Sequence, residues 1–229
     1  MNSTRAARLR GDTPASIGAG PGGRRGGSRN GPGPREVAAE LGFSETVFVR
    51  DAARGDVRIH TPAVELPLVG HPLVGTAWLL REQGFPAAVL RPSAGEVLTW
   101  VEGRHTWISA RPSWAPEFDL HQLSSPAEVE AHPGAGPDEH LQVWAWQDDP
   151  PRAGGPTAGA VRVRVFPTRM GITEDEATGA AAIRLGALLQ RPLTIRQGRA
   201  SEILVRPDED GTVAVGGRVE LVETRAHPV

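Results

Sequence analysis

Two stretches of the chain follow one pattern, and together they limit the folds that it can adopt. Glu65 stands five residues before Gly70, and Glu174 stands five residues before Gly179. Small and apolar residues at helical spacing follow each glycine. Small residues at a helix start let another group approach the free N–H groups of the first turn, where an anion can bind. The repeat therefore predicts a duplicated fold with a ligand site between its halves.

Each of these helix starts comes after a strand rich in arginine and valine, at 57–62 and at 161–167. The two central helices are expected at 72–82 and 178–190. Pro72 fits the first helical position, which would leave His71 at or next to the N-cap. Other expected strands, identified by alternating apolar residues, are 141–146, 202–206 and 212–221.

Residues 1–34 differ in composition from the rest of the chain. They hold nine glycines, four prolines, six arginines and one acidic residue. This composition predicts a disordered basic arm. The first lobe is then expected at 35–110, a connection at 111–139, and the second lobe at 140–229, whose last strand is a candidate to return to the first lobe.

The residue types that are absent exclude several chemistries. The chain has no cysteine and no lysine, which excludes thiolate nucleophiles, zinc–thiolate sites and lysine Schiff bases. Proton transfer is left to Asp, Glu or His. A net charge of −2 gives no reason to expect nucleic acid, and no apolar run is long enough to span a membrane. We expect a cytoplasmic protein.

The histidines do not form a metal-binding pattern. Four histidines do not recur with acidic residues at the spacing of metal ligands, namely His105, His121, His132 and His140. No metal site is therefore expected. His71 could meet a ligand, donate to a carbonyl group, or only cap a helix.

Glu45 is the carboxylate whose position is least typical. In a strand over 43–49 it shares one face with Val47 and Val49. It is either buried or at the end of the strand in water. A buried carboxyl group would suit proton transfer. For Glu174 and Glu176, capping of the following helix is the simpler interpretation.

Four segments, in this order along the chain, together resemble the phenazine-biosynthesis PhzF-like family. They are SETVFV at 44–49, RIHTP with ELP at 58–67, GHPLVGTA at 70–77 and EDEATGAA at 174–181. The match runs from about residue 35 to residue 222. The resemblance implies an α+β fold of the diaminopimelate-epimerase type. In this fold two similar lobes each wrap a curved, mostly antiparallel sheet around a central helix.

The resemblance also implies an activity. Members of the family are isomerases that use no cofactor and are commonly homodimers, and the defining member isomerises trans-2,3-dihydro-3-hydroxyanthranilate. The expected partner is therefore a small-molecule carboxylate. Related racemases of this fold use a pair of cysteines, which this chain does not have.

Carried over by residue, the family's catalytic glutamate corresponds to Glu45, which would take a proton from a substrate carbon and return it elsewhere on the same face. His71 and Asp175 would hold or polarise the substrate. The backbone N–H groups that would bind the substrate carboxylate belong to Gly70, His71, Gly179 and Ala180.

The chain departs from the family pattern at its start. Members begin with strands that the composition of 1–34 is not expected to supply, and members are usually longer than 229 residues. Gly179-Ala180 also stands where the family has Gly-Ser. These departures favour an alternative hypothesis, namely a catalytically impaired or ligand-binding member of the family.

Overall fold

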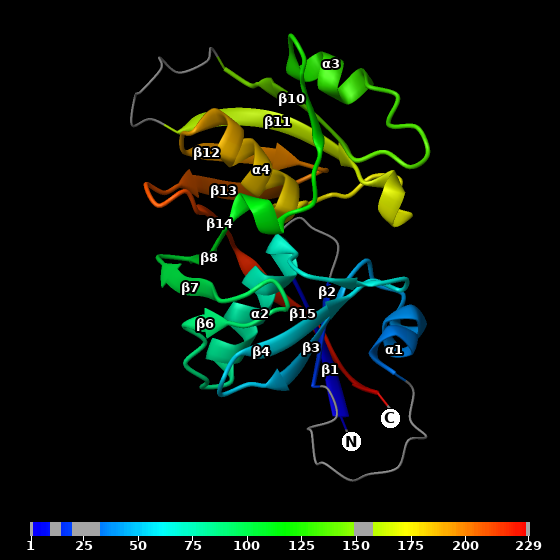
Figure 1. Ribbon diagram of the computed structural model, residues 1–229, viewed down its shortest axis with the longest axis vertical. Coiled ribbons are helices and arrows are strands. Elements are labelled where there is room, and N and C mark those ends of the chain that lie inside the picture. The colour runs from blue at the N-terminus through cyan, green and yellow to red at the C-terminus, as the bar shows by residue number, and fades with distance from the viewer. Residues whose placement is uncertain (1, 10–14, 20–32, 149–157, 228–229) are drawn as a thin grey trace. The chain divides into compact units, whose positions relative to one another are not determined.

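The computed structural model describes residues 2–9, 15–19, 33–148 and 158–227 (Figure 1). The chain divides into two units. Among the described residues, the first unit contains those up to Ile108 together with those from Arg218 onward, and the second contains Ser109–Gly217. Each unit is considered by itself.

The first unit is built on a six-stranded sheet with the order β15-β1-β2-β3-β4-β5. Its strands are β1 (Asn2–Leu9), β2 (Ala15–Ala19), β3 (Thr46–Asp51), β4 (Asp56–His60), β5 (Glu65–Leu66) and β15 (Val219–His227). Most neighbours are antiparallel, while β2 and β3 are parallel. Strands β6 (Val89–Leu90) and β7 (Val97–Glu102) are antiparallel neighbours outside this six-stranded sheet, and with β8 (His105–Ala110) they belong to the second sheet of the chain.

Helix α2 (Gly70–Glu82) is the central helix of this unit. It packs against β1, β2, β3, β15 and β7. Leu73 and Ala77 are fully buried, and the other residues of its first two turns are also buried. A helix that is buried around its circumference must be apolar on every side. Helix α1 (Pro34–Leu41) instead covers Phe48 of β3 with Val37 and Ala38.

Within the expected disordered arm 1–34, residues 2–9 and 15–19 form strands, which corrects the expectation for these two segments; residues 10–14 and 20–32 lie outside the described residues. Strand β1 pairs with both β15 and β2, and β2 pairs with β3. The glycine and arginine content gave no strand signal. A strand between two partners is stabilised by the backbone hydrogen bonds that they supply, and this context outweighs intrinsic propensity. Strand β15 lies in the first unit, as a last strand that returns to the first lobe would.

The second unit contains a sheet with the order β14-β13-β12-β11-β10-β9. Its strands are β9 (Asp119–Gln122), β10 (Leu141–Trp146), β11 (Gly159–Phe166), β12 (Leu193–Gln197), β13 (Ser201–Pro207) and β14 (Val213–Gly217). The pairs β9–β10 and β11–β12 are parallel, and β10–β11, β12–β13 and β13–β14 are antiparallel. Two short 3-10 turns lie at Pro112–Trp114 and Thr168–Met170.

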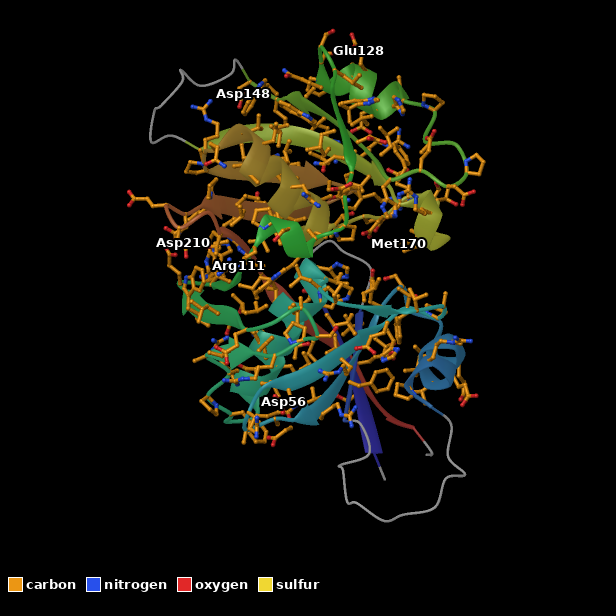
Figure 2. All side chains as sticks on the ribbon, viewed as in Figure 1. Asp56, Arg111, Glu128, Asp148, Met170 and Asp210 are labelled. Atoms are coloured by element: carbon orange, nitrogen blue, oxygen red, sulfur yellow. The ribbon has the colours of Figure 1, made fainter. Side chains whose placement is uncertain are left out.

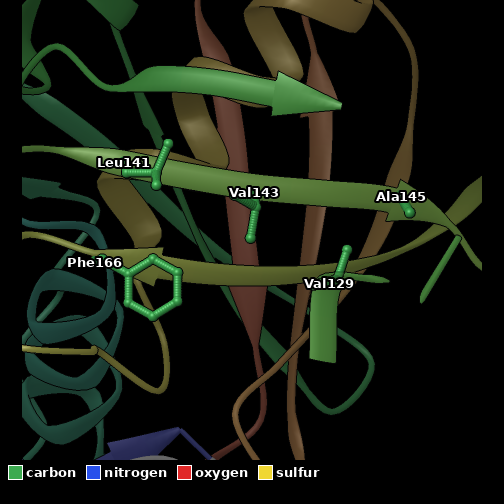
Figure 3. Packing of buried hydrophobic residues seen from close by; sticks show 5 residues of the cluster. All are labelled: Val129, Leu141, Val143, Ala145 and Phe166. Carbon is green, nitrogen blue, oxygen red and sulfur yellow. The ribbon is translucent and has the colours of Figure 1, made fainter. Parts of the chain in front are cut away.

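Alternate residues of β10 and β11 serve the two faces of this sheet. On one face Leu141, Val143, Ala145 and Phe166 pack with Val129 of helix α3 (Pro126–Ala131) (Figure 3). This helix begins at a Ser125 cap, whose side chain accepts from the Glu128 N–H. Glu128 is labelled on this helix in Figure 2. The opposite face carries Val161, Val163 and Val165, all fully buried.

Helix α4 (Gly179–Leu189) packs against β13 and β14 and is the central helix of the second unit. Its closest approach is at Gly186, where a Cβ atom would lie 2.5 Å from Cγ1 of Val205 and 3.0 Å from Cγ1 of Val213. The absence of a side chain therefore sets the distance between helix and sheet.

An α+β class with mostly antiparallel sheets and a central helix in each part is confirmed. Two details differ from expectation. The segment 212–221 is two strands, because β14 pairs with β13 in one sheet and β15 pairs with β1 in the other. The expected connection 111–139 belongs to the second unit and supplies β9 and α3. None of the helices in the described part of the chain is both long and apolar enough to cross a membrane.

The close contact at Gly186 gives a stability prediction. Gly186→Ala should lower the free energy of unfolding by about 1–3 kcal/mol, since the new methyl group overlaps with two valines of the core. This loss exceeds the gain of about 1 kcal/mol that alanine brings to a helix. Urea unfolding measures the difference. Leu188→Ala, at a site that is 57% exposed on the same helix, is the control and should change stability by less than about 0.5 kcal/mol.

Two histidines, the partly buried His60 and the buried His140, make stability depend on pH. Desolvation by burial lowers the pKa of His60 and of His140 below the ordinary value of 6.5. The unfolded chain therefore binds more protons than the folded chain at pH values near and below 6.5. Stability from this source is complete above pH 6.5 and falls as the pH decreases through that value.

We expect His140→Asn to reduce this pH dependence. Asparagine can keep the contact of His140 Nδ1 with the Glu117 carbonyl oxygen, which is 3.1 Å long, but it does not titrate. Urea midpoints measured at about pH 7.5 and about pH 5.5 should differ less in the variant than in the unsubstituted protein. An equal or larger difference in the variant would contradict the assignment.

Candidate active site

Glu45 lies directly before β3 and is buried, with 4% of its surface exposed. The structure therefore decides between the two interpretations of this residue, and the one that places it in water is wrong. The Ser44 hydroxyl donates to Glu45 Oε2 over 2.5 Å. Such a short bond to a carboxylate oxygen is strong and holds the side chain in one orientation.

His71 lies in the first turn of α2 and is also buried. Its Nε2 atom is 3.5 Å from Glu45 Oε2. The helix starts at Gly70 with Val69 as its N-cap, so the expected start at Pro72 is two residues late. Proline is tolerated in the first turn because the N–H groups there have no acceptor within the helix. The first unit thus brings Glu45 and His71 together.

Asp175 is held by both its backbone and its carboxylate. Its N–H donates to the Val165 carbonyl oxygen over 3.0 Å. Its Oδ2 atom accepts from the Thr178 hydroxyl over 2.7 Å, and Oδ1 accepts from the Ala177 N–H over 3.3 Å. Asp175 is 9% exposed. Its carboxylate is therefore fixed while part of its surface stays accessible.

The start of α4 has free hydrogen-bond donors. Thr178 is the N-cap residue, but its side chain makes no cap hydrogen bond because its hydroxyl is directed to Asp175. Among the described residues, no group accepts from the N–H groups of Gly179 and Ala180. Both residues are buried. Uncapped N–H groups at a helix start, together with the helix dipole, favour an anion.

Gln197 is a further member of this region that the sequence analysis did not identify. Its side-chain amide contacts Asp175 and Thr178. No motif marks it, since it is an ordinary polar residue at the end of a strand. The only signal is structural, namely the strand register that pairs Gln197 with Val163.

The repeated acidic residues have a structural role in both units. Arg164 binds Glu174 through two parallel contacts of 2.8 Å, and these raise the pKa of the guanidinium group. Arg58 lies 3.5 Å from Glu65. In each unit, the acid five residues before the glycine therefore pairs with an arginine of the preceding strand. Simple helix capping by Glu174 is not observed, since its carboxylate is committed to Arg164.

The expected site residues are divided between the two units, and those of each unit are called a half-site below. Glu45, Gly70 and His71 lie in the first unit, and the second unit contains Asp175, Gly179 and Ala180. Within the described ranges, no group of three or more His, Asp and Glu side chains could hold a metal ion.

A cavity of about 580 Å³ in the first unit is separate from this half-site. None of Glu45, Gly70 and His71 lines it. Its lining residues are Arg50, Asp56, Arg58, Arg91, Pro92 and Ser93. Two of these arginines are already engaged, Arg58 with Glu65 and Arg91 with Glu96.

Comparisons with known proteins agree with the resemblance in the sequence. A family model described as phenazine biosynthesis-like protein matches residues 29–131. The chain is 32% identical over 203 residues to trans-2,3-dihydro-3-hydroxyanthranilate isomerase of Pseudomonas aeruginosa, which covers 74% of this chain and 73% of the relative. An uncharacterized isomerase of Pasteurella multocida is 26% identical over 239 residues, covering 81% of this chain and 80% of the relative.

Solved structures show the same fold at low sequence identity. A phenazine biosynthesis protein of the PhzF family from Enterococcus faecalis has a TM-score of 0.72 at 16% identity, covering 100% of this chain and 99% of that one. A hydroxyproline epimerase from Agrobacterium vitis, with bound trans-4-hydroxy-L-proline, has a TM-score of 0.64 at 13% identity and covers 98% and 91%. The fold is therefore shared with PhzF-family proteins and with epimerases.

Proposed function

Since this chain belongs to the phenazine-biosynthesis PhzF-like family of isomerases, we propose that it isomerises a small carboxylated substrate by proton transfer and without a cofactor. The observation that carries the proposal is the buried pair of Glu45 and His71, with 3.5 Å between Oε2 and Nε2. A carboxylate shielded from water next to an imidazole is suited to taking a proton from carbon and returning it.

In the proposed reaction Glu45 removes a proton from a substrate carbon and returns it at another position on the same face. The bond from the Ser44 hydroxyl to Oε2 keeps the carboxylate in one orientation during both steps. His71 and Asp175 hold or polarise the substrate. Negative charge grows on the substrate as the proton leaves, and donors that are already oriented stabilise such charge at little reorganisation cost.

The substrate carboxylate is proposed to bind at the starts of the two central helices. The N–H groups of Gly179 and Ala180 support this assignment, since no described residue accepts from them. Gly70 and His71 occupy the equivalent first turn of α2. The family pattern has serine where this chain has Ala180, whose methyl group cannot donate a hydrogen bond. Backbone N–H groups would therefore bind the substrate carboxylate.

Two relatives indicate the class of substrate to test. One is named for trans-2,3-dihydro-3-hydroxyanthranilate, and a structural neighbour holds trans-4-hydroxy-L-proline. Both compounds are small cyclic carboxylates with a hydroxyl group. We propose a substrate of this chemical class.

The alternative of a catalytically impaired or ligand-binding protein has lost part of its basis. It was favoured by the strands expected to be missing at the start of the chain, and β1 and β2 occupy that region. Ala180, where the family pattern has serine, is the departure that remains among the described residues.

Glu45→Gln should abolish proton transfer while leaving the fold intact, since the amide has the same shape but cannot accept the proton. In deuterium oxide, the unsubstituted protein should place solvent label on carbon of a cyclic hydroxy acid, with trans-2,3-dihydro-3-hydroxyanthranilate tested first. The variant should lose at least about a hundredfold in rate. Mass spectrometry of the recovered substrate and product measures the label.

Glu65→Gln is the matched control, because Glu65 is exposed and pairs with Arg58 outside the half-site. It should retain the rate of the unsubstituted protein. Unchanged label incorporation in the Glu45 variant would exclude Glu45 as the proton carrier.

A homodimer located in the cytoplasm is part of the same proposal, because the family resemblance implies it. Light scattering coupled to size-exclusion chromatography should give twice the chain mass of 24.3 kDa. A mass of a single chain at concentrations where the enzyme is active would reject the dimer and leave the proposed reaction unaffected.

A further inference from the structure

We propose that Gln197 is a positioning residue of the second half-site, and that it keeps the start of α4 open for the substrate carboxylate by holding the Thr178 hydroxyl away from it. This inference rests on the proposed function, because it assigns a role to the same anion-binding donors. Gln197 itself is 2% exposed and is not proposed to contact substrate.

Three hydrogen bonds determine the orientation of the Gln197 amide. Its Nε2 group donates to the Asp175 carbonyl oxygen over 2.6 Å and to Thr178 Oγ1 over 2.9 Å. Its Oε1 atom accepts from the Thr178 N–H over 3.1 Å. Both hydrogens of the amide are therefore used. A flipped amide would place oxygen against oxygen at Asp175 and nitrogen against an N–H at Thr178, so only one orientation fits.

The direction of the Thr178 hydroxyl follows from this arrangement. Its oxygen accepts a hydrogen from Gln197, and its own hydrogen points to Asp175 Oδ2 at 2.7 Å. A threonine at an N-cap commonly accepts from the N–H groups of the second or third helical residue. Here it makes no such bond. The contact with Gln197 therefore competes with capping and leaves the donors of the first turn available.

The turn at Gly198, directly after β12, packs closely against the segment that contains Glu176. Gly198 follows Gln197 in the left-handed region, with φ of +54°, and a Cβ atom there would lie 2.9 Å from Cβ of Glu176 and 3.0 Å from its carbonyl oxygen. The end of β12 thus contacts the chain from Asp175 to Thr178 through both a side chain and a glycine backbone. This contact explains how a segment without regular structure is held in one conformation.

Gln197→Met removes all three bonds and keeps the length of the side chain. The Thr178 hydrogen can stay on Asp175, but its oxygen no longer accepts from Gln197 and can then accept from a first-turn N–H group of α4, in competition with a bound carboxylate. We expect affinity for benzoate, used as a simple carboxylate probe, to fall at least about tenfold, and kcat/KM to fall about ten- to a hundredfold, mainly through KM. The Thr178 amide should also exchange with solvent faster.

Gln197→Glu distinguishes the hydrogen bond that Gln197 accepts from the two that it donates. Glutamate keeps an acceptor for the Thr178 N–H but loses both donors. The Thr178 amide should therefore keep its protection from exchange, while benzoate affinity falls as in the methionine variant. The added negative charge would by itself weaken benzoate binding, so the retained protection of the Thr178 amide is the result specific to this inference. If the methionine variant fails to fold, the glutamate variant still tests the inference.

Gln142→Met is the matched control. Gln142 is a buried glutamine on β10, and its strand pairing through Val165 and Val163 places it on the sheet face that carries Gln197. Its amide has no hydrogen-bond partner among the described residues. The same chemical change there should leave benzoate affinity and Thr178 exchange as they are in the unsubstituted protein.

The experiment is NMR on the full chain with nitrogen-15 labelling, following the amides of Thr178 and Ala180 during benzoate titration and during exchange. Unchanged affinity and unchanged exchange in Gln197→Met would overturn the inference. An absence of label transfer by the unsubstituted protein would instead reject the proposed reaction, and the Thr178 readout would still decide the role of Gln197.

Discussion

Each unit encloses one central helix, and in the second unit the N–H groups of Gly179 and Ala180 at the start of that helix have no acceptor among the described residues. Residues of α2 such as Leu73 and Ala77, and of α4 such as Ala181, have no exposed surface. Enclosure requires apolar or small residues around the whole helix. It also shields the first-turn N–H groups from bulk water. A buried donor without an acceptor costs free energy, and an anionic ligand at that point would offset the cost. The residues that allow the helix start to be buried are thus the same residues whose N–H groups would bind an anion.

Much of this architecture follows from local patterns in the sequence. The Gly/Ala-rich run after Gly179 predicted a helix over 178–190, and α4 spans Gly179–Leu189. Strand β10 was predicted with its observed bounds. Such segments succeed because the period of their apolar residues matches the face that they bury. The strands β1 and β2 have no such pattern, and they are set by pairing with β15 and β3, which local sequence does not reveal.

The candidate site was only partly predictable for a related reason. The sequence placed Glu45 on an apolar face but could not decide its burial, because that depends on what covers the end of the strand. His71 was expected near a helix start, and its 3.5 Å distance to Glu45 arises from tertiary packing. Gln197 was missed entirely, since its importance comes from the strand register and from the turn at Gly198.

The duplicated pattern has one role, and the chemistry around it differs between the units. In each unit the repeated acid pairs with an arginine of the preceding strand, Glu65 with Arg58 and Glu174 with Arg164. A role of this kind can be shared by both halves because it serves the fold. The groups suited to reaction are not repeated. Glu45 lies outside the pattern, and its contact with His71 is a feature of the first unit, whereas Asp175 is fixed by Thr178 in the second. In the proposed reaction Glu45 takes and returns the proton while Asp175 only holds or polarises the substrate, so the two carboxylates need different surroundings. A scaffold with two similar halves can provide them only where its sequence departs from the repeat.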